Sequence, residues 1–398
     1  MTLSATGPDF SSIRLALFSD TYAPQVNGVS RTLERLVAAL RARGGSVEVF
    51  TTADPQAQPT PGVHRYPARP FWAYPQLQLS WPKQRTVREA LRAFQPNLVH
   101  AATEFGVGLA GRRAALALEV PFVSSYHTSF TAYAAHYGLG ALQRPGWAFL
   151  RWFHNSGQRT YCPTRAIVEE VSAHGFANCR EWSRGVDGNR FSPGFRSDAF
   201  RDAIGAHADT LVVAYVGRIA PEKNVQVAID AVRSASAARP HAIKFVVVGD
   251  GPFEASARNT APAGTVFTGR LEGHALAEAY ASADLLLFPS TTDTFGNVML
   301  EAMASGTPVI GADVPPTREI LLPDRGWVCP AGDSAAVAQQ LVALIDRPQE
   351  RRSMQVRALA HAQSRTWDAV WDTLFADYLS VLRGATIRNP APALLHAL

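Results

Sequence analysis

The stretch that most constrains the fold is Ser290–Pro308, which lies between two short apolar runs, 283–289 and 309–312. A short run that is apolar throughout is typical of a parallel strand buried on both faces. Gly306-Thr-Pro308 ends a helix that begins no earlier than Gly296. The stretch therefore predicts a strand, a turn, a helix and a second strand, which is the repeating unit of an α/β sheet.

The predicted helix start is a candidate ligand site. A helix that opens at the carboxyl end of a parallel strand directs its free N–H groups and its positive dipole end toward a ligand. Asp293 lies in the turn before this helix, and Glu301 lies more than one turn inside it. Carboxylates accept hydrogen bonds from hydroxyls, so an anion joined to a sugar fits these groups. A plain turn residue and a solvated helix residue are the alternative interpretation.

Two cations occupy a second loop of the same kind. The apolar run 211–216 predicts a strand, and it is followed by Gly217-Arg218 and by Glu222-Lys223-Asn224, which opens a predicted helix at 225–237. Fixed cations and free amides at a helix N-terminus can hold a diphosphate and compensate its charge when a bond to it breaks. We therefore expect Arg218 and Lys223 to bind phosphate.

The first half of the chain shows the same alternation. Strands are predicted at 13–19, 47–51, 97–100 and 121–125. Asn27-Gly28 lies in the loop after the first of them, where glycine lets backbone approach a ligand, and His127 follows the last. A structural histidine is the alternative for His127. The first loop lacks the G-x-G-x-x-G spacing of dinucleotide-binding proteins, which argues against an oxidoreductase.

Length and composition allow two domains. The chain has 398 residues, of which 47% are hydrophobic, and the turn-dense run 181–194 is typical of a connection between domains. We expect a first domain at 1–190 and a second at 205–365. The segment 55–82, rich in proline and aromatic residues, has no clear period and is expected to be a surface loop packed against its own domain, with lipid contact as the alternative.

Charge and cysteine content narrow the class of protein. Residues 1–200 hold 21 Lys and Arg against 13 Asp and Glu, whereas the remainder holds 17 against 20. No nucleic-acid-binding signature accompanies this basic surplus, so an anionic substrate, an anionic membrane surface or simple solubility explains it better. Three cysteines without metal-ligand spacing, and a start at 1–12 without a secretory signal, indicate a cytoplasmic protein with structural thiols.

Six segments, at Gly28, His127, Gly185–Pro193, Arg218 with Lys223, Gly249–Gly251 and Asp293–Gly306, resemble the retaining glycosyltransferases of family 4. Asp20-Thr-Tyr-x-Pro, His127-Thr and Thr292-Asp-Thr-Phe-Gly-Asn are most similar to the GDP-mannose-dependent α-mannosyltransferases and related glycolipid glycosyltransferases. The resemblance implies the GT-B fold, an α/β architecture of two Rossmann-like doubly wound domains facing across a cleft. It also implies that a C-terminal helix within 367–398 crosses back to the first domain.

The resemblance also implies roles for single residues. His127, Arg218, Lys223 and Asp293 would be catalytic, with His127 at the donor sugar and the two cations at the donor phosphates. Asp293 stands where the family usually has Glu, which shortens the acidic side chain by one methylene. Glu301 would hold the ribose. The remaining donor-binding residues would be Asn27, Gly28, Gly217, Arg270, Leu271, Thr294, Phe295, Gly296, Asn297 and Val298.

The expected reaction moves a hexose from a nucleotide diphosphate, with mannose from GDP-mannose as the first candidate, to a lipid or lipid-linked hydroxyl. A front-face displacement in which the departing phosphate takes the acceptor proton would retain the anomeric configuration. No cofactor and no metal are implied, because Asp-x-Asp is missing and the phosphates already have cations. A lipid acceptor would place the protein at the inner face of the membrane.

Other functions stay open at this point. A UDP-glucose- or UDP-glucuronate-dependent glycosyltransferase of glycolipid or polysaccharide synthesis fits the same motifs. A sugar-nucleotide epimerase, a phosphorylase or a non-catalytic nucleotide-sugar binder could share the architecture. The sequence names neither the base nor the acceptor.

Overall fold

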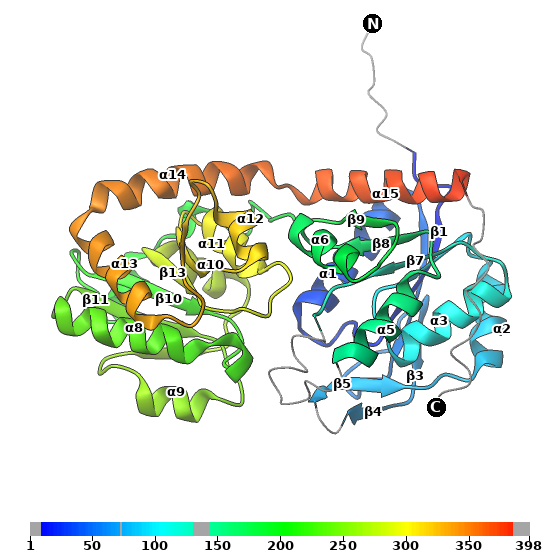
Figure 1. Cartoon of the computed structure of the whole chain (residues 1–398), viewed down its shortest axis with the longest axis horizontal. Helices are drawn as coiled ribbons and strands as arrows, with labels where there is room; N and C mark the ends of the chain where they lie inside the picture. The colour runs from blue at the N-terminus through cyan, green and yellow to red at the C-terminus, as the bar shows by residue number, and fades with distance from the viewer. Residues whose placement is uncertain (1–8, 72–73, 130–142, 385–398) are drawn as a thin grey trace, which may run out of the picture. The chain divides into compact units, whose positions relative to one another are not determined.

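The computed structural model describes residues 9–71, 74–129 and 143–384 (Figure 1). These residues form two compact units. Unit 1 is made of the described residues of Met1–Ser183 and Asp368–Leu398, and unit 2 is Arg184–Trp367. The chain therefore leaves unit 1, builds unit 2 and returns to unit 1 for its last helix.

Unit 1 is built on a seven-stranded parallel sheet. Its strands lie in the order β3-β2-β1-β6-β7-β8-β9. The bounds are β1 Arg14–Ser19, β2 Ser46–Thr52, β3 Val63–Tyr66, β6 Leu98–Ala101, β7 Phe122–Ser125, β8 Arg159–Cys162 and β9 Cys179–Glu181. Residues 15–19 of β1 and all of β6 and β7 are buried, as the continuous apolar runs predict for parallel strands covered on both faces.

Helices and one hairpin complete unit 1. The helices are α1 Gly28–Ala42, α2 Gln84–Phe94, α3 Gly106–Ala117, α5 Gln143–His154, α6 Arg165–Ala173 and α15 Trp367–Arg383, and the hairpin pairs β4 Ala68–Phe71 with β5 Tyr74–Ser80. Trp371, Phe375 and Tyr378 of α15 are buried. Tyr378 reaches the sheet, where its hydroxyl lies 2.6 Å from Nδ1 of His100.

Unit 2 repeats the architecture with six parallel strands in the order β12-β11-β10-β13-β14-β15. The strands are β10 Leu211–Val216, β11 Ile243–Val248, β12 Val266–Gly269, β13 Leu285–Phe288, β14 Val309–Ala312 and β15 Trp327–Cys329. The helices are α7 Asp198–Ala203, α8 Val225–Ala238, α9 Glu254–Thr260, α10 Gly273–Ser282, α11 Asn297–Ala304, α12 Pro315–Leu321, α13 Ser334–Asp346 and α14 Pro348–Ser364.

Each sheet reverses its strand order at one point. In unit 1 the order reverses between β1 and β6, and in unit 2 between β10 and β13. Loops that leave such a neighbouring pair diverge to opposite sides of the sheet and leave room for a ligand at the carboxyl edge. In unit 2 these two loops are 217–224 and 289–296, the segments that the sequence analysis singles out.

The prediction for segment 55–82 was wrong. Residues 63–66 form β3, which pairs in parallel with β2, and residues 68–80 contain the β4–β5 hairpin. The prolines do not prevent these strands, because β3 is the outermost strand of its sheet and the hairpin has only two strands, so few backbone N–H groups need partners.

No helix among the described residues is both long and apolar enough to cross a bilayer. Helix α8 lies within one residue of its predicted bounds, 225–237.

Candidate active site

The candidate site lies at the carboxyl edge of the unit 2 sheet, where loops 217–224 and 289–296 leave the neighbouring strands β10 and β13. Both loops lead into helices, α8 and α11, whose N-termini point to this edge. The fold thus brings together two segments that are about 70 residues apart in the chain.

Loop 217–224 holds Arg218 from two sides. The hydroxyl of Tyr215 donates a 2.8 Å hydrogen bond to the carbonyl oxygen of Arg218. The carboxylate of Glu222 lies 3.5 Å from the Arg218 guanidinium, and the Glu222 side chain is fully buried whereas that of Arg218 is 28% exposed. A buried carboxylate beside a partly exposed guanidinium fixes the cation in place.

The ion pair between Lys223 and Asp293 connects the two loops. Nζ of Lys223 donates to Oδ1 of Asp293 at 2.8 Å, and the two side chains are 17% and 29% exposed. Burial alone would raise the pKa of Asp293, but the charge of Lys223 and its hydrogen bond bring the pKa below its usual value. Asp293 is therefore a carboxylate at neutral pH, able to accept hydrogen bonds from sugar hydroxyls.

A second link between the loops lies beneath that ion pair. The hydroxyl of Thr292 donates to the carbonyl oxygen of Glu222 at 3.2 Å, and both residues are buried. The side-chain amide of Asn224 donates to the carbonyl oxygen of Pro289 at 3.3 Å. The cations of one loop and the acid of the other are therefore held on a common frame.

The N-terminus of α11 lies at the same edge. Gly296 has φ +84°, and a Cβ there would lie 2.7 Å from Cε of Met299 and 2.8 Å from Cζ of Phe288, so this turn requires glycine. Phe295 is 7% exposed and anchors the turn in the core. No side chain caps α11, whose first residue is Asn297, so its first amides remain available to an anion.

Glu301 occupies the second turn of α11. Its carboxylate accepts a 3.0 Å hydrogen bond from the hydroxyl of Tyr280, a fully buried residue of α10. This contact orients the Glu301 carboxylate at the edge. Thr294 and Val298 flank the same turn and are half-buried.

The other predicted residues of unit 2 lie farther along the edge. Gly217 follows β10 and has φ +148°. Arg270 and Leu271 follow β12, which β11 separates from β10. Arg270 pairs with Glu272 at 2.7 Å, and Leu271 packs against the core. Arg270 and Leu271 therefore share the edge with Arg218 but lie two strands away from its loop.

The predicted residues of unit 1 lie at the carboxyl edge of their own sheet. Asn27 caps α1 by accepting from the Ser30 N–H at 2.9 Å, and Gly28 is the first residue of that helix. His127 follows β7, is 8% exposed and meets the ring of Trp182 edge-on at a centroid distance of 5.1 Å. Asn27 thus caps the helix that Gly28 begins.

Two residues of the site region had no assigned role in the sequence analysis. Glu222 is adjacent to Lys223 and reads as a surface acid, yet it is fully buried against Arg218. Tyr280 lies in a helix with an apolar pattern, so its bond to Glu301 gives no sequence signal. Only the three-dimensional neighbours of these groups reveal their roles.

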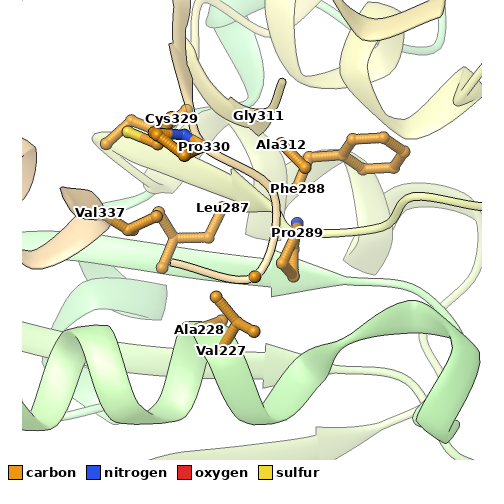
Figure 2. A pocket seen from close by; sticks show the side chains of 12 residues that line it. Val227, Ala228, Leu287, Phe288, Pro289, Gly311, Ala312, Cys329, Pro330 and Val337 are labelled. Atoms are coloured by element: carbon orange, nitrogen blue, oxygen red, sulfur yellow. The ribbon is translucent and has the colours of Figure 1, made fainter. Parts of the chain in front are cut away.

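A small apolar pocket lies near the same edge, between α8 and α13 (Figure 2). Its lining includes Ala228, Leu287, Pro289, Cys329 and Val337, and it contains no charged residue. Burial raises the pKa of the Cys329 thiol to about 11, so this sulfur is not a thiolate at neutral pH. Within the described residues there is also no cluster of three or more His, Cys, Asp or Glu suited to a metal ion.

Comparisons with known proteins identify the family of the chain. Residues 26–190 match the model of Glycosyltransferase Family 4, and residues 210–347 match that of Glycosyl transferases group 1. A GDP-mannose-dependent alpha-mannosyltransferase of Mycolicibacterium smegmatis is 34% identical over 385 residues, covering 94% of this chain and all of the relative. An alpha-monoglucosyldiacylglycerol synthase of Streptococcus pneumoniae is 28% identical, covering 84% of this chain and 79% of the relative.

The solved structures show the same fold. The Anabaena protein HepE, in complex with UDP and glucose, superimposes with a TM-score of 0.73 at 22% identity, covering 92% of this chain and 99% of HepE. The expected architecture of two Rossmann-like halves is therefore confirmed. The chain belongs to glycosyltransferase family 4 and is a hexosyltransferase of the GT-B type.

Proposed function

We propose that this hexosyltransferase transfers mannose from GDP-mannose to a hydroxyl of a lipid or lipid-linked acceptor, with retention of configuration. The observation that carries the proposal is the meeting of Arg218, Lys223, Asp293 and the α11 N-terminus at the point where the unit 2 strand order reverses. The 34% identity to a relative named as GDP-mannose-dependent supports the choice of donor.

In this proposal the donor diphosphate binds the outer face of Arg218, Nζ of Lys223 and the first amides of α11. These donors stabilise the negative charge that develops as the bond between C1 of the sugar and the phosphate oxygen breaks. The acceptor oxygen forms the new bond to C1, and its proton passes to the departing phosphate oxygen. The second product is GDP. No nucleophilic side chain is required.

The carboxylates have binding roles. Asp293 accepts hydrogen bonds from hydroxyls of the sugar, and its pairing with Lys223 keeps it ionised for this task. Glu301, oriented by the hydroxyl of Tyr280, accepts from the ribose hydroxyls. His127 contacts the donor sugar near the reacting carbon.

A specific observation favours one alternative donor class. The fold neighbour HepE was solved with UDP and glucose, and the streptococcal relative carries a glucosyl product in its name. A UDP-glucose-dependent transferase is therefore the second candidate. A lipid acceptor has support from the same relative, whose name includes diacylglycerol.

Thermal unfolding with a panel of nucleotides tests the donor. A ligand that binds only the folded protein raises the midpoint, by an amount set by its concentration relative to Kd. We expect shifts with GDP and GDP-mannose and none with UDP or UDP-glucose. A shift in the unfolding midpoint with the UDP compounds alone would identify a UDP-sugar as the donor in place of GDP-mannose. Incubation with GDP-mannose but no acceptor, followed by product analysis, excludes or reveals an epimerase.

A further inference from the structure

Two of the three cysteines meet at one edge of the unit 1 sheet. Cys162 is the last residue of β8, and Cys179 is the first residue of β9, the outermost strand on this side of the sheet. The parallel register sets Thr160 opposite Cys179. Because Thr160 and Cys162 are two residues apart on β8, the side chains of Cys162 and Cys179 lie on the same face of the sheet.

The two thiols share one apolar cluster against α6 (Figure 1). Cys162 is 1% exposed and belongs to this cluster together with Ile167 and Val171 of α6. Cys179 is half-buried and packs against the cluster. The side chains of Cys162 and Cys179 are joined by a hydrogen bond. One sulfur is thus shielded from solvent, while its neighbour stays partly open to it.

The surroundings of Cys179 favour its thiolate. Its pKa is lowered from 9.0 to about 7, chiefly by the hydrogen bond with Cys162 and further by one with Ser172 and by the charge of Arg180, against the effect of burial. About half of Cys179 is therefore thiolate at pH 7. By contrast, burial raises the pKa of Cys329 to about 11. The chain thus contains its own unreactive reference thiol.

Strand β9 is suited to a small displacement. It has three residues, and β8 is its only partner among the strands described. Cys162 and Cys179 are diagonal neighbours in the register, and diagonal neighbours lie farther apart than directly opposed residues. A disulfide holds two Cα atoms within about 4.4–6.8 Å of each other. Formation of a disulfide between these cysteines therefore pulls β9 along β8.

Trp182 connects this edge of the sheet to His127. Trp182 directly follows β9, and its backbone N–H donates to the carbonyl oxygen of Cys162 at 2.7 Å. The buried ring of Trp182 meets that of His127 edge-on, with the centroids 5.1 Å apart. A displacement of β9 therefore reaches His127 through a single side chain.

We propose that Cys162 and Cys179 form a peroxide-sensitive thiol pair, which closes a reversible disulfide between β8 and β9 and so withdraws Trp182 from His127. The shared cluster, the half-buried position of Cys179 and the backbone link to Trp182 support this inference. It goes beyond the proposed function, because the pair responds to oxidant whichever nucleotide sugar is the donor. Transient disulfides with a sensing role are the kind that occurs in reducing compartments.

The oxidation has two balanced steps. The Cys179 thiolate attacks one oxygen of hydrogen peroxide, the O–O bond breaks, and the departing hydroxide takes a proton to give water, which leaves Cys179 as a sulfenic acid. The Cys162 sulfur then attacks the Cys179 sulfur, the S–O bond breaks, and the hydroxide leaves as water with the Cys162 proton. The two thiols lose two electrons and two protons, and the peroxide becomes two waters. A dithiol such as dithiothreitol reverses the change.

Thiol labelling of the full chain tests the difference in reactivity. At pH 7 we expect iodoacetamide to modify Cys179 at least about tenfold faster than Cys329, because far more of Cys179 is thiolate. Mass spectrometry of the peptides at successive times measures both rates in one sample. Equal rates at the two cysteines would overturn the proposal.

Peptide mapping after oxidation tests the disulfide itself. Trypsin cleaves after Arg165, so the two thiols fall in separate peptides, 160–165 and 166–180. After brief treatment with hydrogen peroxide and capping of the remaining thiols, we expect these two peptides to be joined, and dithiothreitol to separate them. Peptides that stay separate, or a pairing with Cys329 or with a second chain, would contradict the proposal.

Single variants distinguish the attacking thiol from the resolving thiol. In C162A the Cys179 sulfenic acid has no partner, so dimedone should trap it after peroxide treatment. In C179A the buried Cys162 should stay reduced. C329A is the matched control and should form the disulfide like the wild type. A dimedone adduct on Cys162 in C179A would refute the assigned roles. Should C162A fold poorly, C162S provides the same test with a side chain of similar size.

The rate of sugar transfer tests the link to His127. Under the proposed function, the oxidised wild type should turn over about tenfold more slowly, the lower end of the loss expected when the His127 contact is removed. Dithiothreitol should restore the rate, and peroxide-treated C179A should keep it. A disulfide that leaves the rate unchanged would refute the link to His127. A wild type that transfers no sugar in either state would refute the proposed function and leave the disulfide standing.

Discussion

The two units use the same strand reversal for different purposes. In unit 1, Asp20 follows β1 at the reversal, is 1% exposed, and accepts from the Thr103 hydroxyl at 2.7 Å and the Val107 N–H at 2.8 Å. In unit 2, Lys223 and Asp293 meet at the reversal with 17% and 29% of their side chains exposed. One carboxylate binds its own unit together, while the other stays accessible.

The contrast between Asp20 and Asp293 indicates which of two equivalent positions in the repeated architecture can bind a ligand. Burial raises the pKa of Asp20 to about 6, so the fold works against its charge. At Asp293, Lys223 overcomes the effect of burial and lowers the pKa. A charge that the fold maintains near solvent is available for a ligand, whereas one that the fold penalises is committed to structure.

The largest expected effect follows from removing a cation at the unit 2 reversal. Lys223→Ala or Arg218→Ala should lower turnover about 10²- to 10⁴-fold, the scale of one lost electrostatic stabiliser of a developing charge. Steady-state kinetics with the donor measure this. Lys244→Ala, which changes the other lysine of unit 2, is the matched control. Near-normal turnover in Lys223→Ala would remove that residue from the site.

Unit 1 should contribute less to the chemical step. His127→Ala should lower turnover about 10- to 100-fold, since it removes one contact with the donor sugar. The nucleotide product should still stabilise the variant against heat as it does the wild type. Unchanged turnover would make His127 a structural residue packed on Trp182.

A change at Glu222, the buried partner of Arg218, should lower kcat/KM less than a change at Arg218, and only while Arg218 is present. Glu222→Gln keeps the shape of the side chain but removes the charge 3.5 Å from the guanidinium, so Arg218 is held less firmly. We expect about a tenfold loss of kcat/KM. In the Arg218→Ala background the same change should cost almost nothing. Additive losses in the double variant would disprove a role through Arg218.

The stability of unit 1 against unfolding should fall at acid pH because of His100. Burial lowers the pKa of His100 to about 3, whereas an unfolded histidine titrates near 6.5. His100 stays neutral in the folded chain at pH values where it is protonated in the unfolded chain. Its contribution to the free energy of unfolding is therefore fully present above pH 6.5 and is lost as the pH falls toward 3. Between pH 6.5 and 4 the loss is about 3 kcal/mol.

Urea unfolding at several pH values measures this effect. His100→Gln should flatten the decline between pH 6.5 and 4, because the titrating group is gone. His207→Gln changes an exposed histidine and should keep the slope of the wild type. Equal slopes in His100→Gln and wild type would show that His100 does not govern acid sensitivity.

The smallest expected effect is that of metal removal. Arg218 and Lys223 already supply positive charge for the phosphates, so EDTA should leave the transfer rate within about twofold of its original value. A loss of activity that Mg²⁺ or Mn²⁺ restores would show that the proposed cation set is incomplete.

Much of the unit 2 edge could be predicted from sequence because each part has a local signal. Short apolar runs mark the strands, and Gly296 marks a turn that no larger residue tolerates. Parallel pairing then brings the carboxyl ends of β10 and β13 together, and with them Lys223 and Asp293. The strand reversal between β10 and β13 is the one long-range feature needed to place Lys223 beside Asp293.

The parts that sequence reasoning missed depend on neighbours distant in the chain. Glu222 is buried because Thr292 and Arg218 close over it, and a pattern of polar residues gives no sign of that. Segment 63–66 becomes a strand because β2 offers a free edge, although its own composition suggests a loop.

The return of the chain to unit 1 has a consequence for biosynthesis. Unit 2 is one continuous segment, Arg184–Trp367, whereas unit 1 needs α15, the last helix described. On a ribosome, unit 2 can fold as soon as it emerges, while the sheet of unit 1 must wait with His100 lacking the hydroxyl of Tyr378. Loss of the last 20 or so described residues would therefore damage the half of the protein that was synthesised first.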